Sequence, residues 1–303
     1  RTGRRRLCLS LEFIKMWGRL EKFFFSLKAG TLFRYFSVFI LYSVTIGFLL
    51  KLLKYEKVDF FYFFSLFSII ICAQGYTLFL TGASFAAPGN GWFELGCKSL
   101  GVKAINRAVS GESIADTANK MAEGTLYSRE EFEEMDAFVI MHVHEKDVYN
   151  EDRLKNDYKD YSLPFDNSDY ASCFDYVIKR YISDCYNLKD DVNSKYYGSK
   201  FGKPAVIILC THWNDSRKIY NSSARKLAEK WGLPVVEFDK NIGFSSNHKH
   251  PITGNSFSLI FTDDKQIVHD REQGWHPLHG EDSYLQRRMA AIFAETVRKI
   301  FLF

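Results

Sequence analysis

The sequence has little cysteine and little proline, and it lacks an apolar run long enough to be a clear membrane span. Six Cys in 303 residues are too few for a disulfide scaffold, and 6 Pro with 19 Gly exclude collagen-like and low-complexity chains. The Cys beyond residue 76 show no paired spacing, so free buried thiols are expected. Because 47% of the residues are hydrophobic and 17% aromatic, disorder is excluded, and the chain can bury the core of one large domain or two small ones.

Positive charge is concentrated near the N-terminus. Residues 1–59 contain twelve Lys and Arg but only four acidic residues, whereas the whole chain has a net charge of +4. The remaining residues therefore carry a net charge of −4. Such a body offers no basic face for DNA or RNA, so we expect no nucleic-acid partner.

Two apolar runs follow this basic region. Residues 35–50 contain sixteen uncharged residues and residues 60–73 contain fourteen, whereas a full span needs about twenty. A basic flank, the apolar core FFYFFSLFSIIICA and a polar exit are typical of a signal peptide. We expect residues 1–75 to be an export signal, absent from the mature protein if cleaved, or a membrane anchor acting through residues 35–73. Burial of both runs in a soluble core is the remaining interpretation.

From residue 76 onward, short apolar runs alternate with segments whose apolar residues have helical spacing. The runs are rich in β-branched and aromatic residues, and several helical segments end at a glycine. A polar stretch, residues 145–166, is expected to be a long loop. The expected strands are 76–81, 102–109, 136–143, 203–212 and 234–239, and the expected helices are 91–101, 113–124, 168–188, 223–232 and 281–301.

Strands of this kind alternating with helices indicate a parallel sheet covered on both faces. The predicted fold class is α/β, a three-layer α/β/α sandwich with a mostly parallel, five-stranded, flavodoxin-like sheet over residues 76–303. Ligands bind such sheets outside the carboxyl ends of the strands. This rule selects Gly82–Ser84, Ser110–Gly111 and His142–Glu145 as candidate site segments.

Four segments carry chemistry along this pattern. LFLTGASF runs from a strand into Gly-x-Ser, NRAVSGES places Gly111 after the second strand, FVIMHVHEKD ends the third, and QGWHPLHGEDSYL leads into the last helix. In this order they resemble the blocks of the SGNH (GDSL-type) hydrolase superfamily, closest to a bacterial branch. The resemblance implies a serine esterase that works through an acyl-enzyme, with no metal or organic cofactor.

The residues suit the roles that the resemblance implies. A serine hydroxyl is a weak nucleophile that needs an adjacent base, and Ser84 stands just after a strand. Imidazole exchanges protons near neutral pH, which makes His276 the candidate base. The resemblance implies that the backbone N–H groups of Ser84 and Gly111 bind the oxyanion. The plainer interpretations are a helix cap for Ser84, a turn glycine and a surface histidine.

Two positions depart from the superfamily pattern. The oxyanion asparagine is replaced within HVHE by His144 or by Glu145, depending on the register. A neutral imidazole can donate a hydrogen bond there, whereas a carboxylate would repel the oxyanion, so we take His144 as the third donor. The acid is expected three residues before the catalytic histidine, where the chain has Gln273. We assign the acid to Asp270, with Glu272 as a second nearby carboxylate.

Two other classes of function stay open at this point. The same cleft could bind carbohydrate without turnover, with Trp92, Trp213 and Trp275 either stacking on sugar rings or packing in the core. A metal hydrolase could use the chain's clustered histidines, although no His-Glu-x-x-His or Cys-x-x-Cys signature is present. Our prediction is an exported esterase, periplasmic, secreted or membrane-anchored, that removes acyl groups such as acetyl from a small-molecule or carbohydrate ester.

Overall fold

The computed structural model describes residues 75–262 and 264–302, so the segment expected to be an export signal or anchor lies outside the described residues. Within them, five parallel strands form one sheet in the order β2-β1-β3-β4-β5, and two antiparallel strands form a separate hairpin. The strands are β1 (Thr77–Gly82), β2 (Lys103–Asn106), β3 (Ala137–Met141), β4 (Ile207–Cys210), β5 (Val235–Val236), β6 (Lys265–Val268) and β7 (Arg271–Gly274).

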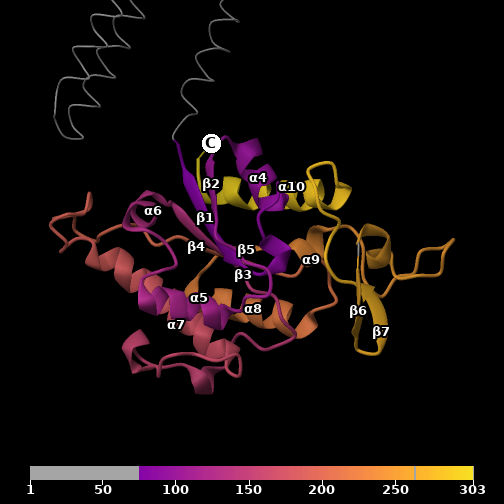
Figure 1. Cartoon of the computed structure of the whole chain (residues 1–303), viewed down its shortest axis with the longest axis horizontal. Coiled ribbons are helices and arrows are strands. Elements are labelled where there is room, and N and C mark those ends of the chain that lie inside the picture. Colours follow the sequence, from indigo (N-terminus) through magenta and orange to yellow (C-terminus); the bar gives the residue numbers. More distant parts are fainter. Residues whose placement is uncertain (1–74, 263, 303) are drawn as a thin grey trace, which may run out of the picture. The chain divides into compact units, whose positions relative to one another are not determined.

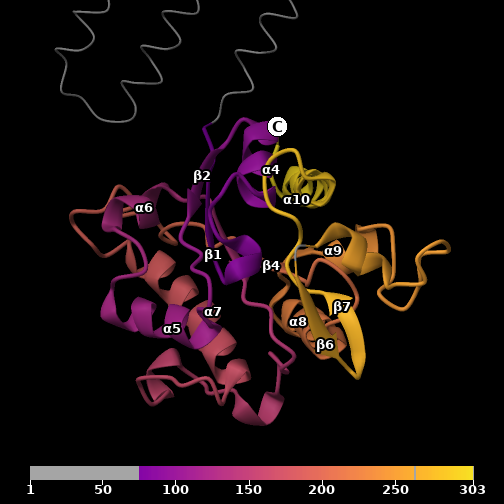
Figure 2. The same ribbon diagram turned by 45° about the vertical axis from the view of Figure 1, so that its right-hand side comes forward.

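Helices cover both faces of the sheet (Figures 1 and 2). Helices α4 and α10 pack together on one face, and α5, α7 and α8 cover the other. The predicted three-layer sandwich with a five-stranded parallel sheet is therefore confirmed. The helices are α4 (Trp92–Leu100), α5 (Ile114–Glu123), α6 (Arg129–Glu134), α7 (Tyr170–Asn187), α8 (Lys218–Trp231), α9 (Phe238–Asn241) and α10 (Tyr284–Ile300), with 3₁₀ turns η1 (Ser84–Ala86), η2 (Glu151–Arg153), η3 (Tyr158–Asp160) and η4 (Phe257–Phe261).

Local sequence explains why these elements begin and end where they do. Every residue of β1 and of β3 is buried, as the continuous apolar runs predict for central parallel strands. Ser113 caps α5 by accepting a hydrogen bond from the N–H of Asp116, and Gly124 ends the helix at φ 72°. This left-handed conformation favours glycine because it has no Cβ. The local sequence therefore sets where each of these strands and helices ends and the next loop begins.

The structure also contains elements that the pattern did not predict. Helix α8 begins at Lys218 rather than at residue 223, and α6 forms where no element was expected. The β6–β7 hairpin stands apart from the sheet and projects beside α9 (Figure 1). Its turn residues, His269 and Asp270, both have positive φ, 49° and 62°. Two such residues form the turn that suits a two-residue hairpin.

Two further expectations can be compared with the described residues. Cys97, Cys173, Cys185 and Cys210 are buried and free, as expected for inert thiols. None of the helices in the described residues is long and apolar enough to cross a membrane.

Candidate active site

Ser84, His276 and Asp264 form a continuous hydrogen-bonded series at the carboxyl edge of the sheet. Ser84 Oγ lies 2.7 Å from His276 Nε2, and His276 Nδ1 lies 2.6 Å from Asp264 Oδ2. The other carboxylate oxygen of Asp264 accepts a 2.7 Å hydrogen bond from the backbone N–H of His276. These contacts match the geometry that a nucleophile, its base and a group orienting the base require.

The end of β1 holds Ser84 in place. Gly82 is the last residue of β1, and a Cβ built on it would lie only 2.7 Å from the carbonyl oxygen of Met141 in β3. The N–H of Ala83 donates to this same oxygen at 3.2 Å, and the carbonyl of Gly82 accepts from the N–H of Val109 at 3.0 Å. Ser84 then opens η1. These hydrogen bonds connect the end of β1 with the end of β3 and with the loop after β2, next to Ser84.

The hairpin explains how a carboxylate twelve positions before the histidine reaches it. Lys265 pairs with Gly274, so antiparallel pairing places the preceding Asp264 opposite Trp275. The N–H of Trp275 donates to the carbonyl of Asp264 at 3.2 Å, and His276 follows directly. The carboxylate at the ring is therefore that of Asp264.

The structure does not bring Asp270, the acid expected from the sequence, to His276; Asp264 lies there instead. Asp270 lies in the turn between β6 and β7, at the far end of the hairpin from Asp264. Gln273, three residues before His276, is a buried residue of β7. The hairpin thus separates Asp264 from His276 in sequence while antiparallel pairing keeps them adjacent in space.

The surroundings of Asp264 favour its ionised form. Burial by itself opposes ionisation, but the hydrogen bonds from the backbone N–H and from the ring of His276 lower the pKa of Asp264. An ionised Asp264 accepts from Nδ1–H and so leaves the lone pair of Nε2 facing Ser84. This tautomer is the one that can take the serine proton.

The three predicted oxyanion donors lie on loops that leave adjacent strands at the same edge. Gly111 is exposed at φ 85° after β2, two residues beyond the Val109 N–H that is bonded to Gly82. His144 is exposed three residues after the end of β3, with its ring centroid 5.3 Å from that of Tyr170. Partial burial and the neighbouring cations lower the pKa of His144. The ring is therefore neutral at neutral pH and carries one N–H.

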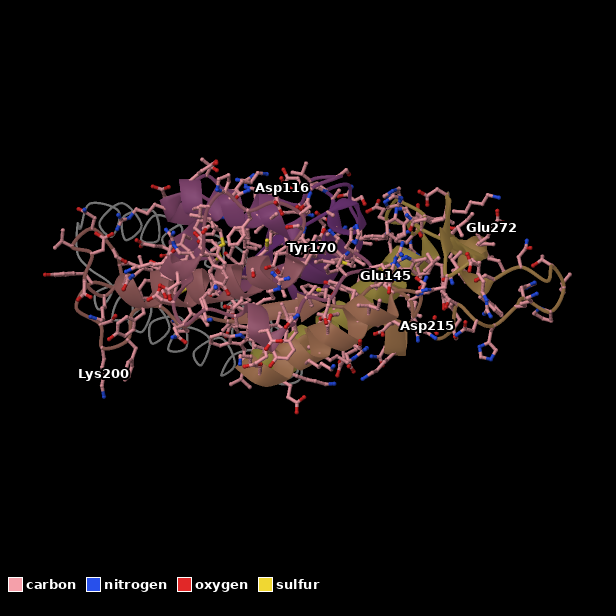
Figure 3. All side chains as sticks on the ribbon, turned by 90° about the horizontal axis from the view of Figure 1, so that it is seen from below. Asp116, Glu145, Tyr170, Lys200, Asp215 and Glu272 are labelled. Atoms are coloured by element: carbon pink, nitrogen blue, oxygen red, sulfur yellow. The ribbon has the colours of Figure 1, made fainter. Side chains whose placement is uncertain are left out.

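Glu145 is held by a helix end and by Arg217. Its Oε1 accepts a 3.3 Å hydrogen bond from the N–H of Ile219 in the first turn of α8, and its Oε2 lies 3.6 Å from Arg217 Nη1. His269 Nε2 lies 3.8 Å from Oε1. In Figure 3, Glu145 lies between Tyr170 of α7 and Glu272 of the hairpin. A helix N-terminus and a guanidinium both stabilise a carboxylate, so the charge at this position is compensated.

A small cavity of about 20 Å³ adjoins the nucleophile. One water-sized sphere needs about 10–15 Å³, so the cavity has room for one or two heavy atoms. It is lined by Ser84, Phe85, Ala86, Ala87, Gly89, Gly91, Trp92, Phe93, Glu94, Pro277, His279 and Gln286.

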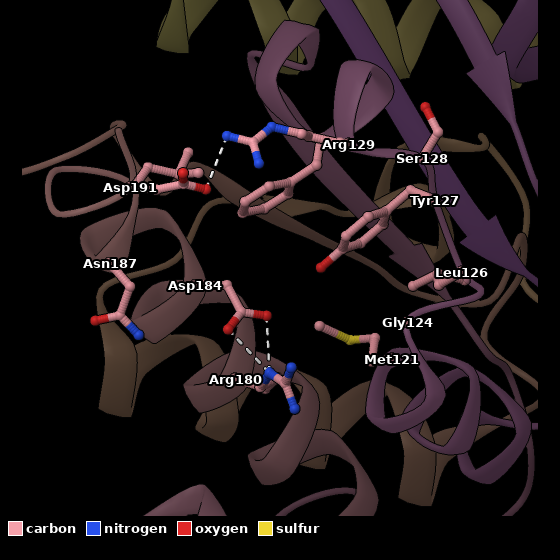
Figure 4. Close-up of a pocket in the computed structure, with 12 residues that line it drawn as sticks. Met121, Gly124, Leu126, Tyr127, Ser128, Arg129, Arg180, Asp184, Asn187 and Asp191 are labelled. Carbon is pink, nitrogen blue, oxygen red and sulfur yellow. Dashed lines mark hydrogen bonds and ion pairs between the residues drawn. The ribbon is translucent and has the colours of Figure 1, made fainter. Parts of the chain in front are cut away.

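A second hollow, of about 370 Å³, lies between the α5–α6 connection and α7 (Figure 4). Its two arginines are already paired, Arg180 with Asp184 at 2.8 Å and Arg129 with Asp191 at 2.7 Å. None of the proposed catalytic residues lines it. We therefore place the candidate active site at Ser84.

The side chains invoked for sugar binding or metal binding have other surroundings. Trp92 and Trp213 are 1% and 0% exposed, so they pack in the core rather than present a surface to sugar. Trp275 is partly buried, with the guanidinium of Arg217 4.3 Å from its ring centroid and the ring of Phe85 4.7 Å away. Within the described ranges, no three His, Cys, Asp or Glu side chains gather as they would around a metal ion.

Sequence reasoning did not select Asp264 or Arg217. No local signal marks Asp264, because neither Lys265–Val268 nor Arg271–Gly274 alternates apolar with polar residues, and the turn between them is His-Asp rather than a glycine-containing pair. Nothing local marks Arg217, which directly precedes α8.

Comparisons with known proteins place the chain by family and by fold. No curated protein matches it. Solved structures similar in fold include a possible lipase from Chitinophaga pinensis (12% identity, 74% of this chain and 98% of that chain, TM-score 0.46) and a member of the lipolytic G-D-S-L family from Veillonella parvula (14%, 75% and 98%, 0.36). A carbohydrate esterase family 2 enzyme from Corynascus thermopiles is also similar (12%, 75% and 67%, 0.39).

At such identities the likeness is one of fold. A direct family match covers residues 75–301, which is three quarters of the chain and includes all seven strands of the part that the structure describes. The chain therefore belongs to the family described as Domain of unknown function (DUF5040).

Proposed function

We propose that this chain is a serine esterase of SGNH type that removes a short acyl group, acetyl in the first instance, through an acyl-enzyme. The observation that carries the proposal is the unbroken series from Ser84 Oγ through both ring nitrogens of His276 to the carboxylate of Asp264. A serine in this setting has a base within 2.7 Å, and the base has an anion behind it. A capping or surface serine needs neither.

In the proposed reaction, Ser84 Oγ attacks the ester carbonyl carbon as its proton passes to His276 Nε2. Asp264 stabilises the imidazolium that forms. The ring then gives this proton to the departing alcohol oxygen, which leaves an acyl group on Ser84. Water attacks the acyl carbon, loses its proton to Nε2, and Ser84 regains that proton as the acid departs. The alcohol and the acid are the two products.

The developing oxyanion needs donors on the side opposite the base. We assign the backbone N–H groups of Ser84 and Gly111, with the neutral ring of His144 in place of the superfamily's asparagine. The compensation of Glu145 by Arg217 and the N-terminus of α8 supports this register. A carboxylate that is held in this way is not directed at an oxyanion.

The small cavity beside Ser84 supports the choice of a short acyl group. Room for one or two heavy atoms beyond the serine fits the methyl group of acetate. We also propose that the alcohol part is an O-acylated carbohydrate, and that the basic and apolar pattern of residues 1–75 exports the domain.

Labelling of the full chain with a fluorophosphonate, read by intact mass, tests the proposal. We expect one adduct on the wild type, none on Ser84→Ala and a much slower reaction on His276→Ala. Ser222→Ala is the matched control, because Ser222 is an exposed serine on α8 with no histidine partner in its hydrogen bond. Hydrolysis of p-nitrophenyl acetate, butyrate and octanoate then ranks acyl lengths.

A folded wild type that takes no adduct overturns the serine-esterase proposal. An adduct with equal turnover of all three esters would retain the esterase and remove the acetyl preference. Acetylated sugars serve as the second substrate series once an adduct on Ser84 is established.

A further inference from the structure

The hairpin that carries Asp264 has few anchors of its own. Of the eight residues in β6 and β7, only Val268, Gln273 and Gly274 are buried. A two-stranded ribbon is marginally stable in isolation. The position of Asp264 must therefore depend on contacts that the hairpin makes with the rest of the domain.

Arg217 supplies contacts to both sides of this hairpin. It is 6% exposed, and it is the last residue of the loop between β4 and α8. Its Nη2 donates to Gln266 Oε1 in β6, and its guanidinium carbon lies 4.3 Å from the ring centroid of Trp275, which follows β7. Trp275 is the residue that pairs with Asp264 and precedes His276. One planar group thus contacts β6 through Gln266 and the chain just after β7 through Trp275, close to Asp264 and His276.

The third contact of Arg217 reaches the loop after β3. Nη1 lies 3.6 Å from Glu145 Oε2, and Glu145 is the neighbour of the proposed oxyanion donor His144. Trp213, four residues before Arg217, adds a 2.9 Å hydrogen bond from its Nε1 to the carbonyl of Trp275. The loop after β4 therefore connects the acid-bearing hairpin to the oxyanion side of the site.

We propose that Arg217 is a positioning residue that holds the β6–β7 hairpin so that Asp264 meets His276, while its other edge holds Glu145 at the start of α8. This inference rests on the proposed function. Arg217 itself does not touch the reacting atoms. A lysine cannot replace it, because an ammonium group lacks the flat face that stacks on Trp275 and the fork that reaches Gln266 and Glu145 together.

The test compares Arg217→Met and Arg217→Lys with wild type in the full chain, by fluorophosphonate labelling of Ser84 and by ester hydrolysis. Methionine keeps the apolar stem without the guanidinium. We expect labelling and kcat to fall about 10- to 100-fold in both variants, with KM within about threefold, and added methylguanidinium to restore part of the rate of Arg217→Met. Arg271→Met is the matched control, since Arg271 is an exposed hairpin arginine that donates to Asn247.

The outcomes separate this inference from the esterase itself. Failure of the wild type to label overturns the proposed function. A wild type that labels while Arg217→Met and Arg217→Lys label at the same rate overturns the role of Arg217. If Arg217→Met does not fold, Gln266→Leu is the deciding variant, because Gln266 is an exposed hairpin residue. A loss of kcat at unchanged KM supports the positioning role of Arg217, and an unchanged kcat refutes it.

Discussion

Replacement of Asp264 by asparagine tests the acid assignment most directly. Asp264 accepts two hydrogen bonds, from Nδ1–H and from the backbone N–H of His276, at 2.6 and 2.7 Å. Asparagine has one acceptor oxygen, so its NH₂ group must face one of these two donors. Either the backbone N–H loses its partner, or the ring turns to the tautomer with its proton on Nε2, which cannot accept from Ser84.

The magnitude follows from these two losses. An unpaired donor costs about 1–3 kcal/mol, which is roughly a 5- to 150-fold loss of rate. Loss of the negative charge behind the imidazolium adds to it, and the corresponding change in a serine protease triad lowers kcat by about 10⁴-fold. We expect Asp264→Asn to lower kcat by about 10³- to 10⁴-fold, or about 4–5.5 kcal/mol in the barrier.

The assay is hydrolysis of p-nitrophenyl acetate by the full chain, with Asp270→Asn as the matched control. Asp270 is an exposed aspartate in the hairpin turn, so its substitution should leave kcat within about twofold. Because the Asp264 side chain is 44% exposed, thermal unfolding should change little. A folded Asp264→Asn variant with more than a tenth of the wild-type kcat, or a large loss in Asp270→Asn, would refute the assignment.

Three further predictions concern stability and acyl selection. Burial lowers the pKa of His142 and of His212 to about 3, so as the pH falls these rings take up protons in the unfolded chain before they do so in the folded one. The free energy of unfolding should therefore fall between pH 6.5 and 3, by about 2 kcal/mol per ring from pH 7 to 5. Urea midpoints that do not change with pH would contradict this. Gly82→Ala should lower the free energy of unfolding by about 1–3 kcal/mol and slow labelling of Ser84, because the new Cβ meets the carbonyl of Met141 in β3. Gly75→Ala should change neither quantity, because no atom lies within 4 Å of its Cβ position. Ala87→Val should fill the small cavity and lower kcat/KM for acetyl esters by roughly tenfold or more; an unchanged acetyl rate would place the acyl group elsewhere.

The sequence by itself determined the sheet and selected the proposed nucleophile and base. Apolar runs such as residues 136–143 place hydrophobic side chains on both faces of a strand, and both faces must then be covered. A parallel sheet with helices on both sides was therefore predictable. Ser84 follows such a strand, and His276 precedes a strongly amphipathic last helix. Both residues stand next to elements that local patterns mark, although the contacts that hold them in place come from distant parts of the chain.

Only the tertiary structure decided the acid and the charge at the oxyanion side. Asp264 reaches the histidine through the pairing register of a hairpin, which depends on which residues adopt positive φ in its turn. Glu145 is compensated by the N-terminus of a helix that begins more than seventy residues later and by Arg217 beside it. Such contacts depend on where distant backbones end in space, and short-range spacing in a sequence does not record that.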